Sequence, residues 1–335
     1  MDKKPAKPPP NIFLYPPRLS VLSDETISTD DLGADHFDLG LRVGPIYDIV
    51  RHPDTRTPMT IAIYGDWGAG KTSAMKWLEG HLGRWNKHSR AKKGITVRTA
   101  WFYPWKYQTR EDVWRGLVAE VIIACLGAET TSSKALLAAG EDLGRFLGAS
   151  FIDLLSGLKL SAGMISADFK KLEQVKENAR QFVNPQNAYL NEFESTLKTW
   201  IGKSLGKRER MVVFIDDLDR CMPDIALSVL EALKLYLDID RLIFVVGVDK
   251  PVVDQLVEKY YKNLGVSADK SRDYLSKMFQ IEATIAPTNI QVEDFLGEVV
   301  KDNYVWDSLK EVERGAFQDV ILSLAPHSPR EIKRL

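Results

Sequence analysis

The feature that most constrains the fold is an octapeptide, Gly65 to Thr72, which fits the pattern G-x-x-x-x-G-K-[ST] without a mismatch. An apolar segment, Met59 to Tyr64, precedes it and predicts a buried parallel strand, and the residues that follow, Ser73 to Glu79, predict a helix. The glycines let backbone N–H groups converge on an anion, and the helix N-terminus adds a partial positive charge. The segment therefore predicts a phosphate-binding loop between a strand and a helix.

Each residue type in this loop suits one part of a nucleoside triphosphate. We expect Lys71 to reach the β- and γ-phosphates and the Thr72 hydroxyl to bind Mg²⁺. Trp67 has two interpretations, a contact with nucleotide or packing on the adjacent helix. The predicted nucleotide-binding residues are the loop, the residue after it and one aspartate downstream: Gly65, Asp66, Trp67, Gly68, Ala69, Gly70, Lys71, Thr72, Ser73 and Asp249.

The composition is that of a soluble globular protein with one large domain or two modest ones, since 44% of the 335 residues are hydrophobic and 27% are charged. A net charge of −1 provides no general attraction to nucleic acid or anionic membrane. Two basic clusters, residues 87–93 and 203–210, lie between predicted elements and are interpreted as solvated loops. Two cysteines exclude a disulfide framework and a four-cysteine metal site, which indicates a reducing cytoplasm.

Strands alternate with helices along the chain, which predicts a parallel α/β sheet. The first 26 residues, rich in lysine and proline, are expected to form a disordered or extended arm. The core is expected from residues 27–106 and 211–286. The remaining strand candidates are residues 95–102, 211–216, 242–248 and 279–285, and the helix candidates are residues 39–50, 113–126 and 225–237.

Residues 107–210 are too many for a single crossover connection and predict a helical insertion. Arg145, Asp153 and Lys159 interrupt its most apolar stretch, so we expect no transmembrane span. Two interpretations of this stretch stay open: intramolecular packing, or a helix that binds a protein partner or a membrane surface.

A second half of a nucleotide site is predicted where an apolar strand candidate ends in Asp216 and Asp217. A carboxylate at the end of a central strand is suited to Mg²⁺, which we assign to Asp216, and Asp217 is suited to orient or deprotonate the attacking water. Paired aspartates are also common in turns, so the assignment depends on the phosphate-binding loop upstream. Asp219 and Arg220 have two equal interpretations: a turn with a surface ion pair, or a charge relay at the rim of the site.

Two further residues are candidates for the phosphate end of the site. Asp249 follows the strand candidate 242–248, where it could position the γ-phosphate or water, or cap the next helix. Arg330 lies in a basic segment that begins a predicted helix, and it either stabilises transition-state charge from a lid formed by residues 287–335 or belongs to a basic surface helix.

Together these segments resemble the KAP family of P-loop ATPases. The matching segments run in the family's order: residues 65–72, 104–108, 215–221, 274–280 and 329–334. The resemblance implies a P-loop fold of the additional-strand class with a mostly parallel five-stranded sheet, a C-terminal helical segment and Mg²⁺-ATP chemistry. It also implies a role in signalling or in defence against phage, and it favours a functional Arg330.

Many members carry transmembrane helices where this chain has a polar insertion, so we expect a soluble, cytoplasmic member. The chain stops just after the last matching segment, so we expect either a stand-alone ATPase or an effector domain beyond that point.

The predicted function is ATP binding and slow hydrolysis that acts as a regulatory switch, with Lys71, Asp217 and Arg330 as catalytic residues and Thr72 and Asp216 as Mg²⁺ ligands. The alternative is a non-catalytic scaffold organised by bound nucleotide. An ATPase stimulated by nucleic acid is a third hypothesis, which the near-neutral charge disfavours. A kinase of small substrates is also disfavoured. We expect a homo-oligomer or a protein partner bound through residues 107–210.

Overall fold

The computed structural model describes residues 38–91, 94–126, 143, 188–236, 239–263, 277–286, 291 and 315–316. The predicted arm (1–26), much of the insertion (107–210) and almost all of the predicted lid (287–335) lie outside these residues. The chain divides into two units, one of Met1–Thr26, Trp67–Ala69 and Ala286–Leu335, the other of Ile27–Asp66 and Gly70–Ile285. The elements described below belong to the second unit.

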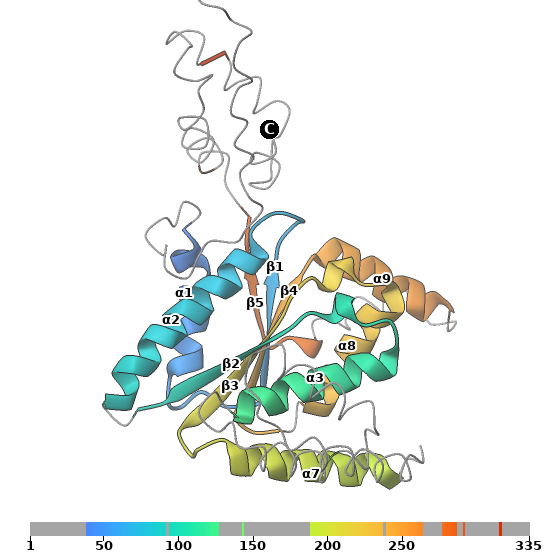
Figure 1. Ribbon diagram of the computed structural model, residues 1–335. Coiled ribbons are helices and arrows are strands. Elements are labelled where there is room, and N and C mark those ends of the chain that lie inside the picture. The colour runs from blue at the N-terminus through green and yellow to red at the C-terminus, as the bar shows by residue number, and fades with distance from the viewer. Residues whose placement is uncertain are drawn as a thin grey trace, which may run out of the picture. The chain divides into compact units, whose positions relative to one another are not determined.

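Five parallel strands form one sheet in the order β2-β3-β4-β1-β5 (Figure 1). All five strands predicted from the sequence are present, which confirms the α/β class. The additional strand of the predicted class is β4, since it lies between β1 and β3. The strands are β1 (Met59–Tyr64), β2 (Thr96–Phe102), β3 (Glu209–Ile215), β4 (Leu242–Val248) and β5 (Ile281–Thr284).

Apolar strand sequences correspond to central positions in the sheet. Every residue of β4 is buried, as is every residue of β3 after Glu209, because helices cover both faces of these strands. The edge strand β5 alternates half-buried and exposed residues instead. A near-continuous apolar run therefore predicted a strand covered on both sides, as expected for parallel sheets.

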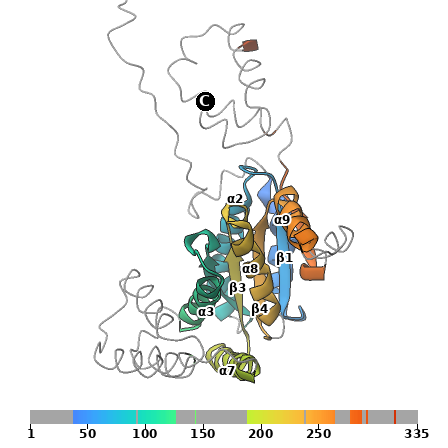
Figure 2. The ribbon, with the colours of Figure 1, turned by 90° about the vertical axis from the view of Figure 1, so that its right-hand side faces the viewer.

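The helices form a layer on each face of the sheet (Figures 1 and 2). On one face α1 packs on α2, and α2 packs on β2 and β4. On the other face α3, α7, α8 and α9 contribute to one apolar core together with the sheet. The helices are α1 (Leu39–Arg51), α2 (Lys71–Ala91), α3 (Arg110–Leu126), α7 (Ala188–Ser204), α8 (Pro223–Tyr236) and α9 (Lys250–Asn263), with short 3-10 turns η1 (Pro104–Lys106) and η2 (Leu218–Arg220).

The first and last helices of the predicted insertion, α3 and α7, pack against the core. Nine residues of α3 are buried, because the helix contacts β2, α7 and α8. From α7, Phe193, Leu197 and Ile201 enter the same apolar cluster. Both ends of the insertion are therefore part of the packed unit.

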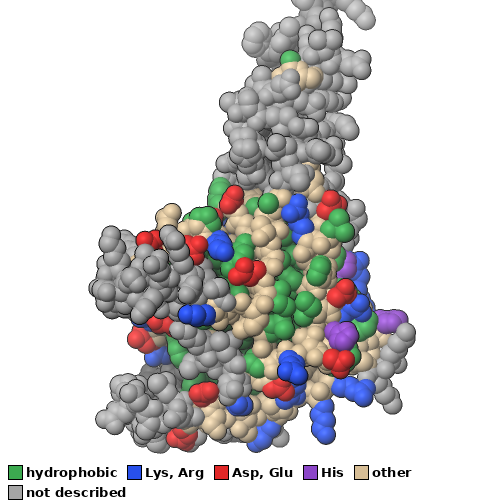
Figure 3. Space-filling model, turned by 180° about the vertical axis from the view of Figure 1, so that it is seen from behind, with side chains coloured by type: hydrophobic (Ala, Val, Ile, Leu, Met, Phe, Trp, Pro, Cys, Tyr) green, Lys and Arg blue, Asp and Glu red, His purple; other side chains and the backbone are tan. Residues whose placement is uncertain are grey.

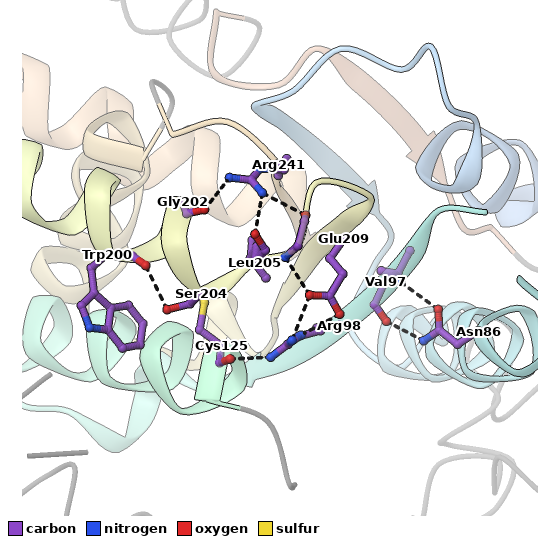
Figure 4. Close-up of polar contacts among 11 residues, drawn as sticks. Asn86, Val97, Arg98, Cys125, Trp200, Gly202, Ser204, Leu205, Glu209 and Arg241 are labelled. Carbon is purple, nitrogen blue, oxygen red and sulfur yellow. Dashed lines mark hydrogen bonds and ion pairs between the residues drawn. The ribbon is translucent and has the colours of Figure 1, made fainter. Parts of the chain in front are cut away.

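Polar side chains complete the backbone hydrogen bonding at the amino end of the sheet (Figure 4). The Asn86 side chain donates to the carbonyl of Val97 at 2.6 Å and accepts from its N–H at 2.8 Å, which pairs the outer edge of β2 with α2. Arg98 forms an ion pair with Glu209 at 2.9 Å and donates to the carbonyl of Cys125. These contacts join β2 to α2, α3 and β3.

Candidate nucleotide site

Several of the predicted site residues lie at the carboxyl edge of the sheet. Because β1, β3 and β4 run parallel, the residues that follow them, Gly65, Asp216 and Asp249, leave the sheet at the same edge. Gly65 donates its N–H to the carbonyl of Val248 at 3.2 Å, which fixes the start of the loop against β4. The fold thus brings together two sequence segments about 150 residues apart, as the motif order requires.

Lys71 begins α2 and is 7% exposed. Its ammonium group donates to the carbonyls of Gly65 at 2.9 Å and Asp66 at 3.1 Å, so the side chain folds back over the start of the loop. Gly70 has a φ of +102°, a conformation that a residue with a Cβ rarely adopts, and Gly68 has a φ of +82°. The backbone conformation therefore favours glycine at positions 68 and 70 of the loop.

Asp216 is the most deeply buried acid of the site, at 2% exposure. Burial raises the pKa of its carboxyl above the ordinary value, an effect opposed by a hydrogen bond from the Thr72 hydroxyl. The N–H of Asp217 also donates to Oδ1 of Asp216 at 2.9 Å. The contact between Thr72 and Asp216 joins the start of α2 to the end of β3.

This hydroxyl and carboxylate fit a Mg²⁺ ion. Mg²⁺ prefers oxygen ligands and is commonly held by one or two protein oxygens together with waters and substrate phosphates. Within the described part of the chain, no group of three or more His, Cys, Asp or Glu residues could hold a metal by itself. A site of this kind is complete only when nucleotide phosphates supply further oxygens.

Asp217 has a left-handed backbone, with a φ of +58°. Its carboxylate forms an ion pair with the Nε of Arg220 at 2.9 Å, across the short turn η2. Of the two interpretations of Asp219 and Arg220, a turn with an ion pair is therefore present. The partner is Asp217, the residue expected to prepare the water.

Asp249 caps α9. Its Oδ1 accepts a 3.3 Å hydrogen bond from the N–H of Val252, and its carbonyl accepts one from Val253 at 3.0 Å. The side chain is 7% exposed. The capping interpretation is therefore satisfied, and a role toward the γ-phosphate stays a prediction.

Gly247 is a site residue that the sequence analysis missed. A Cβ at this position would lie 3.3 Å from Oδ1 of Asp216 and 3.0 Å from the terminal methyl carbon of Met75. The glycine therefore makes room for the carboxylate on the neighbouring strand. A glycine inside the otherwise apolar strand Leu242–Val248 is a signal of close approach that could have identified it.

The segment after β2 packs beside the acidic strand end, since η1 contacts both η2 and α8. Burial raises the pKa of Tyr103 to about 12, with Asp216 as the next largest cause. Tyr107 stacks on Phe102 at 5.4 Å between ring centroids and lies so close to Gly116 that a Cβ there would come within 2.3 Å of its ring. This segment is therefore clamped between β2 and α3.

Glu120 lies one turn beyond Gly116 on α3. Burial raises the pKa of its carboxyl to about 7, and the positive charge of Lys106 opposes the shift. Glu120 in turn contributes to a raised pKa of Tyr107, about 12, whose main cause is burial. A titratable carboxyl group thus lies under the segment that borders the acidic strand end.

Some predicted site residues are not placed with this group. Arg330 lies outside the described residues. Trp67, Gly68 and Ala69 belong to the other unit of the chain. Ser73 lies in the first turn of α2, directly after Thr72.

Comparison with known proteins identifies the family. The family model for the KAP family P-loop domain matches residues 44–335. The chain belongs to this family. Among solved structures, the KAP domain is similar to the ORC1 protein of Aeropyrum pernix in complex with DNA, with 11% sequence identity and a TM-score of 0.47, over 91% of this chain and 59% of that chain. A search of curated proteins gave no match. No helix within the described ranges is long and apolar enough to cross a membrane.

Proposed function

We propose that this KAP domain binds ATP with Mg²⁺ and hydrolyses it slowly, as a regulatory switch. The observation that carries the proposal is the contact between Thr72 and Asp216, which joins the phosphate-binding loop to the acidic strand end. Lys71 lies at the start of the same helix, and Asp217 follows Asp216 directly. This arrangement, together with family membership, supports nucleotide chemistry at the carboxyl edge of the sheet.

Each residue has a role that its environment supports. Lys71 exchanges its two carbonyl partners for the β- and γ-phosphates, since phosphate is a stronger acceptor than a neutral carbonyl. Thr72 and Asp216 would hold the Mg²⁺ ion, which neutralises charge on the phosphates when bound. Asp217 orients and deprotonates water, Asp249 positions the γ-phosphate end, and Arg330 stabilises transition-state charge from the C-terminal segment.

The ion pair between Asp217 and Arg220 supports slow turnover. A carboxylate 2.9 Å from a guanidinium group is a weaker base than a free one, because the positive charge favours its ionised form. Hydrolysis then requires the pair to separate. A switch of this kind stays in the ATP state until a partner or a neighbouring subunit moves Arg220.

The biological role rests on the family resemblance, which favours signalling or defence against phage in the cytoplasm. We propose that the ATP state is read by another copy of the chain or by a protein that binds residues 107–210. The proposed preference of the site for adenine nucleotides also rests on the family resemblance.

Phosphate release from Mg²⁺-ATP tests the proposal. We expect turnover by the wild type to be lost in Lys71→Ala, together with ATP binding. In Asp217→Asn, hydrolysis is expected to fall about 100-fold while ATP binding persists. Asp224→Asn is the control, because it makes the same change at an exposed aspartate nearby in the chain, in the first turn of α8.

The alternative function, a scaffold organised by nucleotide, predicts a different pattern. ATP would bind tightly without turnover in the wild type, and Asp217→Asn would behave like Asp224→Asn. Repeating the assay over a range of protein concentrations separates a lone active chain from an assembly, since specific activity rises with concentration only in the second case.

A further inference from the structure

A recess of about 580 Å³ lies at the opposite, amino end of the sheet, away from the phosphate-binding loop. It is formed where α1 and α2 end and where β2 and β3 begin. Its walls combine cationic groups with an aromatic ring and include Asp48, Arg51, His52, Trp85, Ile95 and Arg208. Its size is within the range of small-ligand pockets, about 300–1,000 Å³.

The recess lies between the two basic clusters of the sequence, residues 87–93 and 203–210. The interpretation of both clusters as loops was wrong in part, because the first begins within α2 and the second ends within β3. Trp85 lies beside the first cluster and Arg208 lies in the second, about 120 residues later. The end of α2 also exposes Arg84, Lys87 and Arg90, of which Arg90 is close enough to Glu209 to help lower the pKa of that carboxyl. Figure 3 shows the molecule from behind, and at its lower right, where α2 ends, Lys, Arg and His side chains gather with some acidic side chains among them.

Three acids lie near the recess. Asp48 pairs with Arg51 at 2.7 Å, and Glu209 pairs with Arg98 at 2.9 Å. The third, Asp54, is 90% exposed and lies 4.0 Å from His52. Arg84, Lys87, Arg90 and Arg208 are exposed as well, so basic groups outnumber these acids at this end of the sheet, although the whole chain carries a net charge of only −1. A positive pole of this kind attracts a polyanion.

The aromatic wall is held in place. The Trp85 indole N–H donates to the carbonyl of Ile95 at 2.9 Å, and the Arg51 guanidinium lies 4.9 Å from the centre of the indole ring. The opposite wall is also fixed, because the buried guanidinium of Arg210 donates to the carbonyls of His52 at 2.7 Å and Pro53 at 3.0 Å. A preformed recess loses little entropy on binding.

We propose that this recess and the exposed cations beside it bind single-stranded nucleic acid. The cations contact phosphates, and one base enters the recess against Trp85. A basic track next to an aromatic ring is the combination that binds single strands without a strict sequence preference. A lone phosphate would use the charge but leave most of the 580 Å³ empty.

Fluorescence anisotropy of a labelled oligothymidylate about 16 nucleotides long tests the proposal with the full chain. We expect Arg208→Glu to weaken binding about tenfold or more and to reduce the dependence of affinity on salt. Asp54→Lys, which replaces an acid that is 90% exposed beside His52, should tighten binding. Lys198→Glu makes the same charge change as Arg208→Glu on an exposed position of α7 and should alter the affinity less than about twofold.

Two further measurements separate this site from the phosphate-binding loop. Lys71→Ala should bind the strand as the wild type does, so failure of the ATPase proposal leaves this one standing. Arg208→Glu should retain its melting temperature and its ATP binding, which excludes unfolding. Three outcomes would each overturn the proposal. Arg208→Glu and Lys198→Glu could lose the same affinity for the strand, or the wild type could bind a duplex of the same length equally well. Free nucleotide could also displace the strand at a similar concentration.

Discussion

The two ends of the sheet each contain a deeply buried charged side chain, and the two charges are satisfied very differently. At the amino end, Arg210 is 5% exposed and donates to four carbonyls, those of Val50, His52, Pro53 and Thr55, at 2.7 to 3.0 Å. At the carboxyl end, Asp216 is 2% exposed and its pKa is raised by burial. Burial alone therefore does not mark function. Incomplete compensation of a buried charge is the better indicator of a ligand site.

The largest effect that we expect concerns the compensated charge. Arg210→Met would leave four inward-facing carbonyls without their donor, so the free energy of unfolding should fall by about 3–5 kcal/mol. Urea denaturation measures this difference. Arg208→Met, two residues earlier and exposed, is the control and should change stability by less than about 0.5 kcal/mol. A loss below about 1 kcal/mol in Arg210→Met would show that solvent replaces the guanidinium, and the contrast between the two ends would fail.

A second prediction uses pH to probe the less compensated end. Burial raises the pKa of Glu120 from 4.5 to about 7, so between these values the folded state holds a proton that the unfolded state releases. Stability should therefore fall as pH rises through this window and then level off. Glu120→Gln removes this dependence. We expect it to match the wild type near pH 5 and to be more stable by about 2 kcal/mol at pH 8, after allowance for solvent screening.

Urea denaturation of both proteins at the two pH values provides the comparison. Lys106→Met serves as a control, because it removes the positive charge that opposes the shift of Glu120 and should therefore extend to higher pH the range over which stability falls. Parallel pH profiles for wild type and Glu120→Gln would contradict a buried, protonated carboxyl group.

The third prediction concerns the space around Asp216. In Gly247→Ala, the new methyl group would crowd Oδ1 of Asp216 at 3.3 Å, so affinity for Mg²⁺-ATP should fall about tenfold. Isothermal titration calorimetry with and without Mg²⁺ measures the affinity for ATP. The loss of affinity should be larger with Mg²⁺ present. Gly83→Ala is the control, since a Cβ there meets nothing within 4 Å and should stabilise the α2 helix by about 0.5–1 kcal/mol. Equal nucleotide affinity in both variants would show that Gly247 has no role at the site.

The sequence predicted the carboxyl end far better than the amino end. The phosphate-binding loop and the acidic strand end are each recognisable from a few consecutive residues. The parallel order of the strands then brings Lys71, Thr72 and Asp216 to one edge of the sheet. Strands β1, β3 and β4 were also predictable, because strands covered on both faces are apolar almost throughout.

The amino end was not predictable because its contacts join residues that no local pattern links. Arg210 and its carbonyl partners are separated by at least 155 positions, and Trp85 and Arg208 line one recess only because β2 and β3 are neighbours. The two basic clusters were therefore interpreted as unrelated loops. Gly247 was missed for a similar reason, since its constraint comes from a side chain on the adjacent strand.

The smallest effect on stability that we expect comes from the ion pair at the rim of the carboxyl end. Arg220 and Asp217 are 43% and 19% exposed, so Arg220→Ala should change the free energy of unfolding by less than about 1 kcal/mol. Its effect on turnover should exceed its effect on stability, because a released Asp217 is a stronger base, and we expect the hydrolysis rate to rise about two- to fivefold. Single-turnover phosphate release measures the rate. Arg110→Ala is the control, because it removes an arginine of similar exposure from an ion pair between α3 and α8. A lower rate in Arg220→Ala would mean that Arg220 assists the reaction. The ion pair with Asp217 would then promote hydrolysis and would not slow it.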